Sequence, residues 1–192
     1  MQYPAASVAG VRAHLLVRDR YVLGADDQAG PNYSGQPAVN SHYAKANVIF
    51  LGLVGLGKSH LATALGYAAC QQGMSVLFAN AIDVINTLHA AQTKGTLKAE
   101  LRKYTSPSLL VLDEIGYLPI DQRGADLLFQ VISARYERGS IVLTTNKAYN
   151  QWPTIFNGDS TITSAVLDRL LHHGHTVVIE GPSYRMKDRI EN

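Results

Sequence analysis

The chain has 192 residues, which is enough for one domain with a sizeable hydrophobic core. Apolar residues make up 46% of it and charged residues 17%, a balance typical of an ordered soluble protein rather than a disordered one. The net charge of +2 does not demand a nucleic-acid partner, and a single cysteine, Cys70, excludes both an intrachain disulfide and a cysteine-based zinc site.

The N-terminal segment MQYPAASVAGVRAHLLVRD lacks the basic head and long apolar body of a signal peptide. No uninterrupted apolar run reaches membrane-spanning length. We therefore expect a cytoplasmic location and no membrane partner. Cys70 lies in an apolar helical stretch, so we expect it to be a small buried residue of the core.

Residues 1–46 differ in composition from the rest of the chain. They contain the run GADDQAGPNYSGQP, whose glycines and prolines are typical of a loop or linker. The stretch before it, VRAHLLVRDRYVL, is compatible with one short helix or one strand. We therefore divide the chain into an N-terminal region, 1–46, that is partly loop, and a domain over 47–192.

From Asn47 onward, short apolar runs alternate with segments of helical periodicity. Buried strands are predicted at NVIFLG, SVLFA, SLLVLDE, SIVLTTN and TVVIEG. Helices are predicted at KSHLATALGYAACQQG, AIDVINTLHAAQTKG, TLKAELRKY, DQRGADLLFQVISARYERG and residues 160–173. This alternation predicts an α/β fold with a five-stranded parallel sheet covered by helices on both faces. The loops after its strands should line one edge, where ligands bind in such sheets.

The loop after the first of these strands carries a phosphate-binding motif. The segment GLVGLGKS, residues 52–59, matches G-x-x-x-x-G-K-(S/T), although a glycine-rich turn can fit the pattern by chance. The glycines allow the backbone N–H groups to surround phosphate oxygens, and the following helix contributes its positive end. Lys58 should reach the β- and γ-phosphates, and the Ser59 hydroxyl should ligate Mg²⁺. The predicted nucleotide-binding residues of this segment are Gly52, Gly55, Leu56, Gly57, Lys58, Ser59 and His60.

Polar residues follow two of the other predicted strands. Asp113 and Glu114 end the most apolar strand, where Asp113 can contact the nucleotide and hold Mg²⁺ opposite Ser59. Glu114 can deprotonate the attacking water, and Asn146 can hold that water or the γ-phosphate. The alternatives are loop-capping carboxylates and a turn asparagine. Together with the phosphate loop, these residues favour hydrolysis of a nucleoside triphosphate such as ATP.

Residues 47–185 resemble the IstB/DnaC-type AAA+ ATPases, and in particular the IstB transposition helpers of bacterial insertion sequences. The resemblance rests on NVIFLG, GKSHLATALGYAAC, LLVLDEIGYLPID, GADLLFQVISARYERGS and SAVLDRLLHHGHTVVIEGPSYR. It implies that Asp113 and Glu114 form the Walker B pair and that Asn146 is sensor 1. It also implies that Arg169 is an arginine finger acting on a neighbouring subunit, and that Arg185 is the sensor 2 residue contacting nucleotide in its own subunit.

The resemblance further implies a biological role. Such proteins oligomerise on double-stranded DNA with ATP and present it to a transposase of the same insertion sequence. The alternatives are a DnaC-like loader of a replicative helicase, a truncated remnant without turnover, and a small-molecule kinase. We disfavour the kinase because the sequence shows no arginine-rich lid, and the Asp-Glu pair suits water as the nucleophile.

Several features depart from the family pattern or remain open. Leu53, Val54 and Leu56 replace the usual prolines and a small polar residue in the phosphate loop, and the region before Asn47 is shortened, which suggests impaired activity. The basic residues Lys94, Lys98, Arg102 and Lys103, with Tyr104, suit either DNA phosphates or a solvated helix face. The residues His172, His173 and His175 are not favoured as a metal site, because no carboxylate or cysteine partner is evident.

Overall fold

A computed structural model describes residues 7–8, 11–16 and 45–184 of the chain. The glycine- and proline-rich run predicted to be a linker, and Arg185, lie outside these residues. The strands are β1 (Ser7–Val8), β2 (Val11–Leu16), β3 (Asn47–Gly52), β4 (Val76–Asn80), β5 (Leu109–Ile115), β6 (Ser140–Thr145) and β7 (Gly174–Glu180). The helices are α1 (Lys58–Gln71), α2 (Ala81–Thr93), α3 (Leu97–Thr105), α4 (Gln122–Arg135), α5 (Ser160–Leu171) and the 3₁₀ helix η1 (Tyr149–Thr154).

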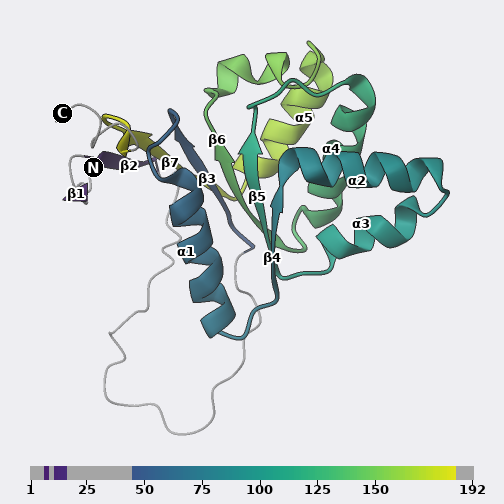
Figure 1. The fold of residues 1–192 in the computed structure, drawn as a ribbon, viewed down its shortest axis with the longest axis horizontal. Coiled ribbons are helices and arrows are strands. Elements are labelled where there is room, and N and C mark those ends of the chain that lie inside the picture. The colour runs from purple at the N-terminus through teal and green to yellow at the C-terminus, as the bar shows by residue number, and fades with distance from the viewer. Residues whose placement is uncertain (1–6, 9–10, 17–44, 185–192) are drawn as a thin grey trace, which may run out of the picture.

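The strands form one sheet in the order β1-β2-β7-β3-β6-β5-β4 (Figure 1). Strands β3 to β7 pair in parallel, which confirms the predicted five-stranded parallel sheet. Strand β2 adds an antiparallel partner to β7. The described part of the stretch VRAHLLVRDRYVL, Val11–Leu16, is therefore a strand rather than a helix. The short β1 extends the same edge.

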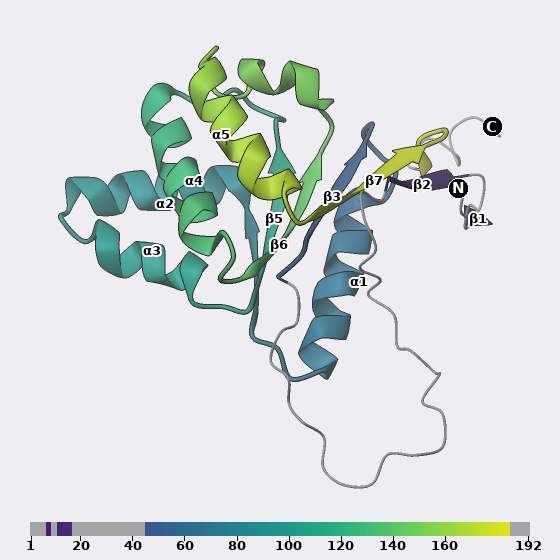
Figure 2. The same ribbon diagram turned by 180° about the vertical axis from the view of Figure 1, so that it is seen from behind.

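Helices cover both faces of the parallel strands, as predicted. Helix α1 packs on one face, whereas α2, α4 and α5 lie on the other (Figures 1 and 2). Because successive strand side chains point to opposite faces, β5 contributes to both cores. Its Leu110 and Leu112 join the larger cluster under α2, α4 and α5, while Leu109 and Val111 join the cluster under α1.

Two expectations about burial were wrong. Cys70 is exposed, because only one narrow stripe of α1, marked by Ala62 and Gly66, is buried against the sheet. Strand β4 was expected to be fully buried, but it forms the edge of the sheet and leaves Phe78 47% exposed. Hydrophobic periodicity predicted both the helix and the strand. Their burial depends on which elements pack against them, and the sheet topology decides that.

The crossovers place the loops that carry the predicted nucleotide-binding residues at one edge of the sheet. The loops after β3, β5 and β6 all leave from the carboxyl ends of adjacent parallel strands. This is the edge at which ligands bind in open α/β sheets.

Candidate nucleotide-binding site

The phosphate loop joins β3 to α1, as predicted. Gly55 and Gly57 have φ angles of 82° and 81°, in the left-handed region that favours glycine. Lys58 begins α1 and is 4% exposed, and its Nζ donates a hydrogen bond of 2.7 Å to the Leu53 carbonyl. The same amine lies 5.9 Å from the centre of the Tyr117 ring.

Two glycines of this loop are also required by close packing against the end of the chain. A Cβ atom on Gly52 would collide with the Ile179 carbonyl of β7, and one on Gly55 would collide with the Ser183 hydroxyl. The Tyr184 N–H donates a 3.0 Å hydrogen bond to the Gly55 carbonyl. The segment after β7 therefore supports the loop directly.

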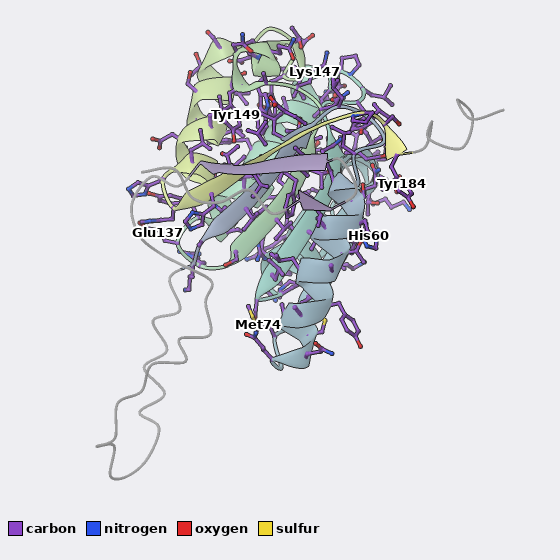
Figure 3. All side chains as sticks on the ribbon, turned by 90° about the vertical axis from the view of Figure 1, so that its left-hand side faces the viewer. His60, Met74, Glu137, Lys147, Tyr149 and Tyr184 are labelled. Atoms are coloured by element: carbon purple, nitrogen blue, oxygen red, sulfur yellow. The ribbon has the colours of Figure 1, made fainter. Side chains whose placement is uncertain are left out.

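The other loop residues occupy two environments. Leu56 is 4% exposed and belongs to the core cluster under α1, so its side chain points away from a ligand and only its backbone can contact phosphate. His60 is exposed near the start of α1 (Figure 3). Leu53 and Val54, which replace the usual prolines, are 70% and 50% exposed.

A hydrogen-bonded network joins the loop to the ends of β5 and β6. The Ser59 hydroxyl donates to Asp113 Oδ1 at 2.9 Å, and the Thr144 hydroxyl donates to the same oxygen. The Glu114 N–H in turn donates to the Thr144 hydroxyl at 2.9 Å. Ser59 and Asp113, 54 positions apart in the sequence, are thus brought together as predicted.

Glu114 has an uncommon backbone and a partner that the sequence analysis missed. Its φ of 64° lies in the left-handed region, at an irregularity in the β5–β6 pairing between Leu112 and Ile115. Its Oε2 accepts a 2.9 Å hydrogen bond from Asn80 Nδ2, and Asn80 also caps α2. The signal in the sequence was an asparagine directly after an apolar strand, the same pattern that singled out Asn146.

Asn146 lies at the same edge of the sheet. It directly follows β6, whose Thr145 pairs with Ile115 of β5. Its Oδ1 is buried, and no described residue gives it a hydrogen bond. Because buried acceptors are nearly always paired, this oxygen is suited to a water or ligand donor.

Arg169 lies at the opposite end of the sheet. Its carbonyl and that of Leu170 accept hydrogen bonds of 3.4 and 3.1 Å from Asn47 Nδ2, at the first residue of β3. The phosphate loop begins after Gly52, five steps further along the strand, or about 16 Å away. The Arg169 guanidinium stacks 4.9 Å from the Phe129 ring centre and donates to the Ala165 carbonyl. The structure therefore does not bring Arg169 to the nucleotide site of its own chain.

The residues at the loop fit a magnesium-bound triphosphate. Glycines with positive φ allow the backbone to close around phosphate oxygens, and the hydroxyl–carboxylate pair Ser59–Asp113 offers the hard oxygen ligands that Mg²⁺ requires. Asn146, whose buried Oδ1 has no hydrogen-bond partner among the described residues, follows β6 at the same edge of the sheet.

The family model of the IstB-like ATP-binding proteins matches residues 38–192. The chain belongs to this family. The IstB-like chain is 43% identical over 145 residues to an ATP-binding protein of insertion sequence IS5376 from Geobacillus stearothermophilus, covering 76% of this chain and 57% of that protein. It is 46% identical over 143 residues to an ATP-binding protein of insertion sequence IS21 from Pseudomonas aeruginosa, covering 74% of this chain and 54% of that protein. The chain thus spans a little over half the length of these relatives.

Solved structures similar to the IstB-like chain have the same fold. A DNA replication initiation factor superposes with a TM-score of 0.62 at 24% identity, covering 78% of this chain and 44% of that one. The DnaC helicase loader superposes with a TM-score of 0.59 at 21% identity, covering 71% and 79%. The fold is therefore that of an AAA+ P-loop protein, as expected. No helix within the described residues is both long and apolar enough to cross a membrane.

Proposed function

We propose that this IstB-like protein hydrolyses ATP, with Mg²⁺ held between Ser59 and Asp113. The observation that carries the proposal is the 2.9 Å Ser59–Asp113 hydrogen bond at the phosphate loop, with Glu114 next in the chain. A Mg²⁺ ion bound to these oxygens would neutralise charge on the β- and γ-phosphates, which is the largest requirement of phosphoryl transfer.

The residues around this pair have distinct parts in the reaction. Glu114 accepts a proton from the attacking water, and its bond to Asn80 fixes the orientation of its carboxylate. The buried Oδ1 of Asn146 accepts a hydrogen bond from that water. Lys58 Nζ, which donates to the Leu53 carbonyl, turns to the phosphate oxygens when nucleotide enters the loop.

Arg169 serves the nucleotide of a neighbouring subunit. This part of the proposal is supported by its position at the far end of β3 from its own loop. A guanidinium stays charged and can bind phosphate oxygens through two parallel hydrogen bonds. Hydrolysis would then require self-association. We also assign Arg185 to the nucleotide of its own subunit, because the residue before it, Tyr184, donates a hydrogen bond to Gly55 of the loop.

We place this ATPase in DNA transposition, with double-stranded DNA and a transposase as partners. The support is the association of the 43–46% identical relatives with insertion sequences. On α3 and the turn before it, Lys94, Lys98 and Arg102 are exposed and suited to phosphate contacts. Tyr104 is buried and cannot stack on bases, and Lys103 is 2.7 Å from Glu100. The helicase-loader alternative rests on likeness of fold alone.

ATP turnover by the Glu114→Gln variant tests the catalytic assignment. The amide cannot accept the water proton, so we expect hydrolysis to fall by at least about 100-fold while nucleotide binding persists. Lys58→Ala should instead lose nucleotide binding itself, as measured with a fluorescent ATP analogue.

Glu100→Gln on α3 is the matched control for the loss of one carboxylate and should turn over ATP at the rate of the unmodified chain. Undiminished hydrolysis in Glu114→Gln would contradict its role as the base. ATP turnover, measured with and without duplex DNA, separates an active enzyme from a remnant that binds nucleotide without hydrolysing it.

A further inference from the structure

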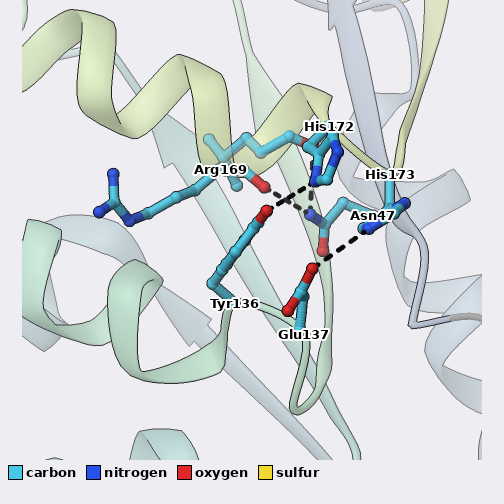
Figure 4. Close-up of polar contacts among 7 residues, drawn as sticks. Asn47, Tyr136, Glu137, Arg169, His172 and His173 are labelled. Atoms are coloured by element: carbon cyan, nitrogen blue, oxygen red, sulfur yellow. Dashed lines mark hydrogen bonds and ion pairs between the residues drawn. The ribbon is translucent and has the colours of Figure 1, made fainter.

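Three side chains with metal-binding atoms meet at the end of the molecule where α5 passes into β7. Glu137 comes from the turn after α4, and His172 and His173 directly follow α5 (Figure 4). One ligand atom from each residue lies within 4.8 Å of the others. We propose that Glu137, His172 and His173 bind a divalent transition-metal ion of the zinc class, leaving a fourth position for water.

The spacing of His173 and Glu137 suits a shared ion better than a direct hydrogen bond. His173 Nε2 lies 3.7 Å from Glu137 Oε1, an ion-pair distance when the imidazole is protonated and beyond hydrogen-bond range. Two ligands on one tetrahedral Zn²⁺, each about 2.0–2.1 Å from the metal, are separated by about 3.3 Å. A small side-chain rotation would therefore bring His173 Nε2 and Glu137 Oε1 to the separation expected of two ligands on one ion.

Tyr136 fixes the orientation of His172. The Tyr136 hydroxyl is 2.6 Å from His172 Nδ1, and the two rings stack with centres 5.9 Å apart. When His172 Nδ1–H donates its hydrogen bond to the Tyr136 hydroxyl, Nε2 carries the lone pair that can bind the metal. Metal-binding histidines commonly use their second nitrogen in this way, and the partner holds both tautomer and ring.

The backbone presents Glu137 in an uncommon conformation. Its φ of 57° lies in the left-handed region, where residues other than glycine are rare. Hydrogen bonds from the Arg138 and Gly139 N–H groups to the Arg135 carbonyl hold this turn. Such conformations persist where the surroundings enforce them, and they gather at functional sites.

The sequence analysis disfavoured a metal site at the histidines because it found no carboxylate partner. Folding supplies one: Glu137 lies 35 positions before His172 in the chain but is next to it in space. His175 is not a member of the cluster, since it lies within β7 with a buried Nδ1. All three proposed ligands are exposed, so an ion reaches them directly.

The cluster is separate from the nucleotide site and close to Arg169. Glu137 and His60, which directly follows the phosphate-loop motif, lie on opposite sides of the molecule (Figure 3). Arg169 precedes His172 by one helical turn, and its guanidinium extends away from the cluster (Figure 4). A bound ion would tie the turn after α4 to the end of α5, and this consequence does not depend on ATP hydrolysis.

Zn²⁺ titrated into the full chain, followed by calorimetry, tests the proposal. We expect one equivalent to bind, and Glu137→Gln, His172→Ala and His173→Ala each to weaken that binding at least about tenfold. The matched control is His89→Ala, an exposed histidine on α2, which should bind like the unmodified chain. Tyr136→Phe should weaken binding about tenfold through the lost hydrogen bond to His172.

Equal Zn²⁺ affinity in the three ligand variants and the control, with unchanged metal-free melting temperatures, would overturn the proposal. The absorption of a Co²⁺-loaded unmodified chain provides a second measurement that needs no variant. An intense visible band is expected for a four-coordinate site, whereas a weak spectrum typical of octahedral Co²⁺ would also overturn it. Unchanged affinity in Tyr136→Phe would overturn the part assigned to Tyr136.

Discussion

Two buried charged side chains, Asp113 and Arg135, have different reasons for their burial. Asp113 lies at the candidate site and accepts two hydroxyl hydrogen bonds, an arrangement suited to a metal ligand. Arg135 is fully buried at the end of α4, and burial lowers its pKa to about 10. It therefore remains protonated at neutral pH and needs strong acceptors around it.

Those acceptors predict a large structural role for Arg135. Its guanidinium donates to four backbone carbonyls, which belong to Tyr104, Pro107, Ser108 and Ser140. Arg135→Met would leave these carbonyls without their donor, at a cost of about 3 kcal/mol in the free energy of unfolding. Urea denaturation measures the loss. Arg138→Met, at an exposed position in the next turn, is the control and should change stability little. Equal stabilities in the two variants would show that these hydrogen bonds contribute nothing net.

At the scale of elements, the first turn of α5 is held by side-chain contacts. Asp159 caps α5 by accepting from the Ile162 N–H at 2.9 Å, and it also accepts from the Gln122 side chain. The Ile162 hydrogen bond, followed by that from Gln122, holds the pKa of Asp159 below its ordinary value of 3.8. The cap therefore depends on an ionised carboxylate.

The lowered pKa of Asp159 predicts an acid-sensitive helix start. The folded state binds the Asp159 proton less readily than the unfolded state does. The stabilisation of the fold by ionised Asp159 is therefore complete above about pH 4, and it is lost as pH falls through the folded-state pKa. Asp159→Asn keeps a capping oxygen but cannot titrate. Thermal melts between pH 2 and pH 6 should show a smaller loss of stability toward acid in this variant. Parallel curves for both proteins would contradict this account.

At the scale of the whole molecule, the two ends of the parallel sheet carry different groups. The carboxyl end holds the phosphate loop, Asp113 and Glu114, whereas the opposite end holds Arg169. Under the proposed function, Arg169 therefore acts on the nucleotide of another copy of the chain. The division of the chain at residue 46 stays a prediction, although β2 within that region pairs with β7.

This separation predicts complementation between inactive variants. Arg169→Ala should bind ATP but lose turnover, because we propose that the arginine acts on the nucleotide of a neighbouring subunit. Mixing it with Glu114→Gln should restore part of the activity, since some interfaces then join an intact Glu114 to an intact Arg169. Turnover is measured at concentrations where both variants associate. Absence of restoration under those conditions would exclude action between subunits.

Local patterns determined much of this protein. The alternation of apolar strands and amphipathic helices predicted the parallel sheet, and the motif from Gly52 to Ser59 predicted the phosphate loop in its observed place. These features depend on residues close in the sequence, because hydrophobic periodicity and glycine backbone freedom determine structure over only a few positions. The meeting of Ser59 with Asp113 followed from the rule that parallel strands end at one edge.

Only the tertiary structure decided which distant side chains meet. The Asn80–Glu114 hydrogen bond, the exposure of Cys70 and the cluster of Glu137 with the two histidines all depend on the order of strands and the packing of helices. Periodicity shows that a residue faces a neighbour but does not identify that neighbour. Pairing across 34 or 35 positions is set by the minimum of free energy for the whole fold. The sequence thus determined that the site binds a nucleotide, and the fold determined which distant side chains surround it.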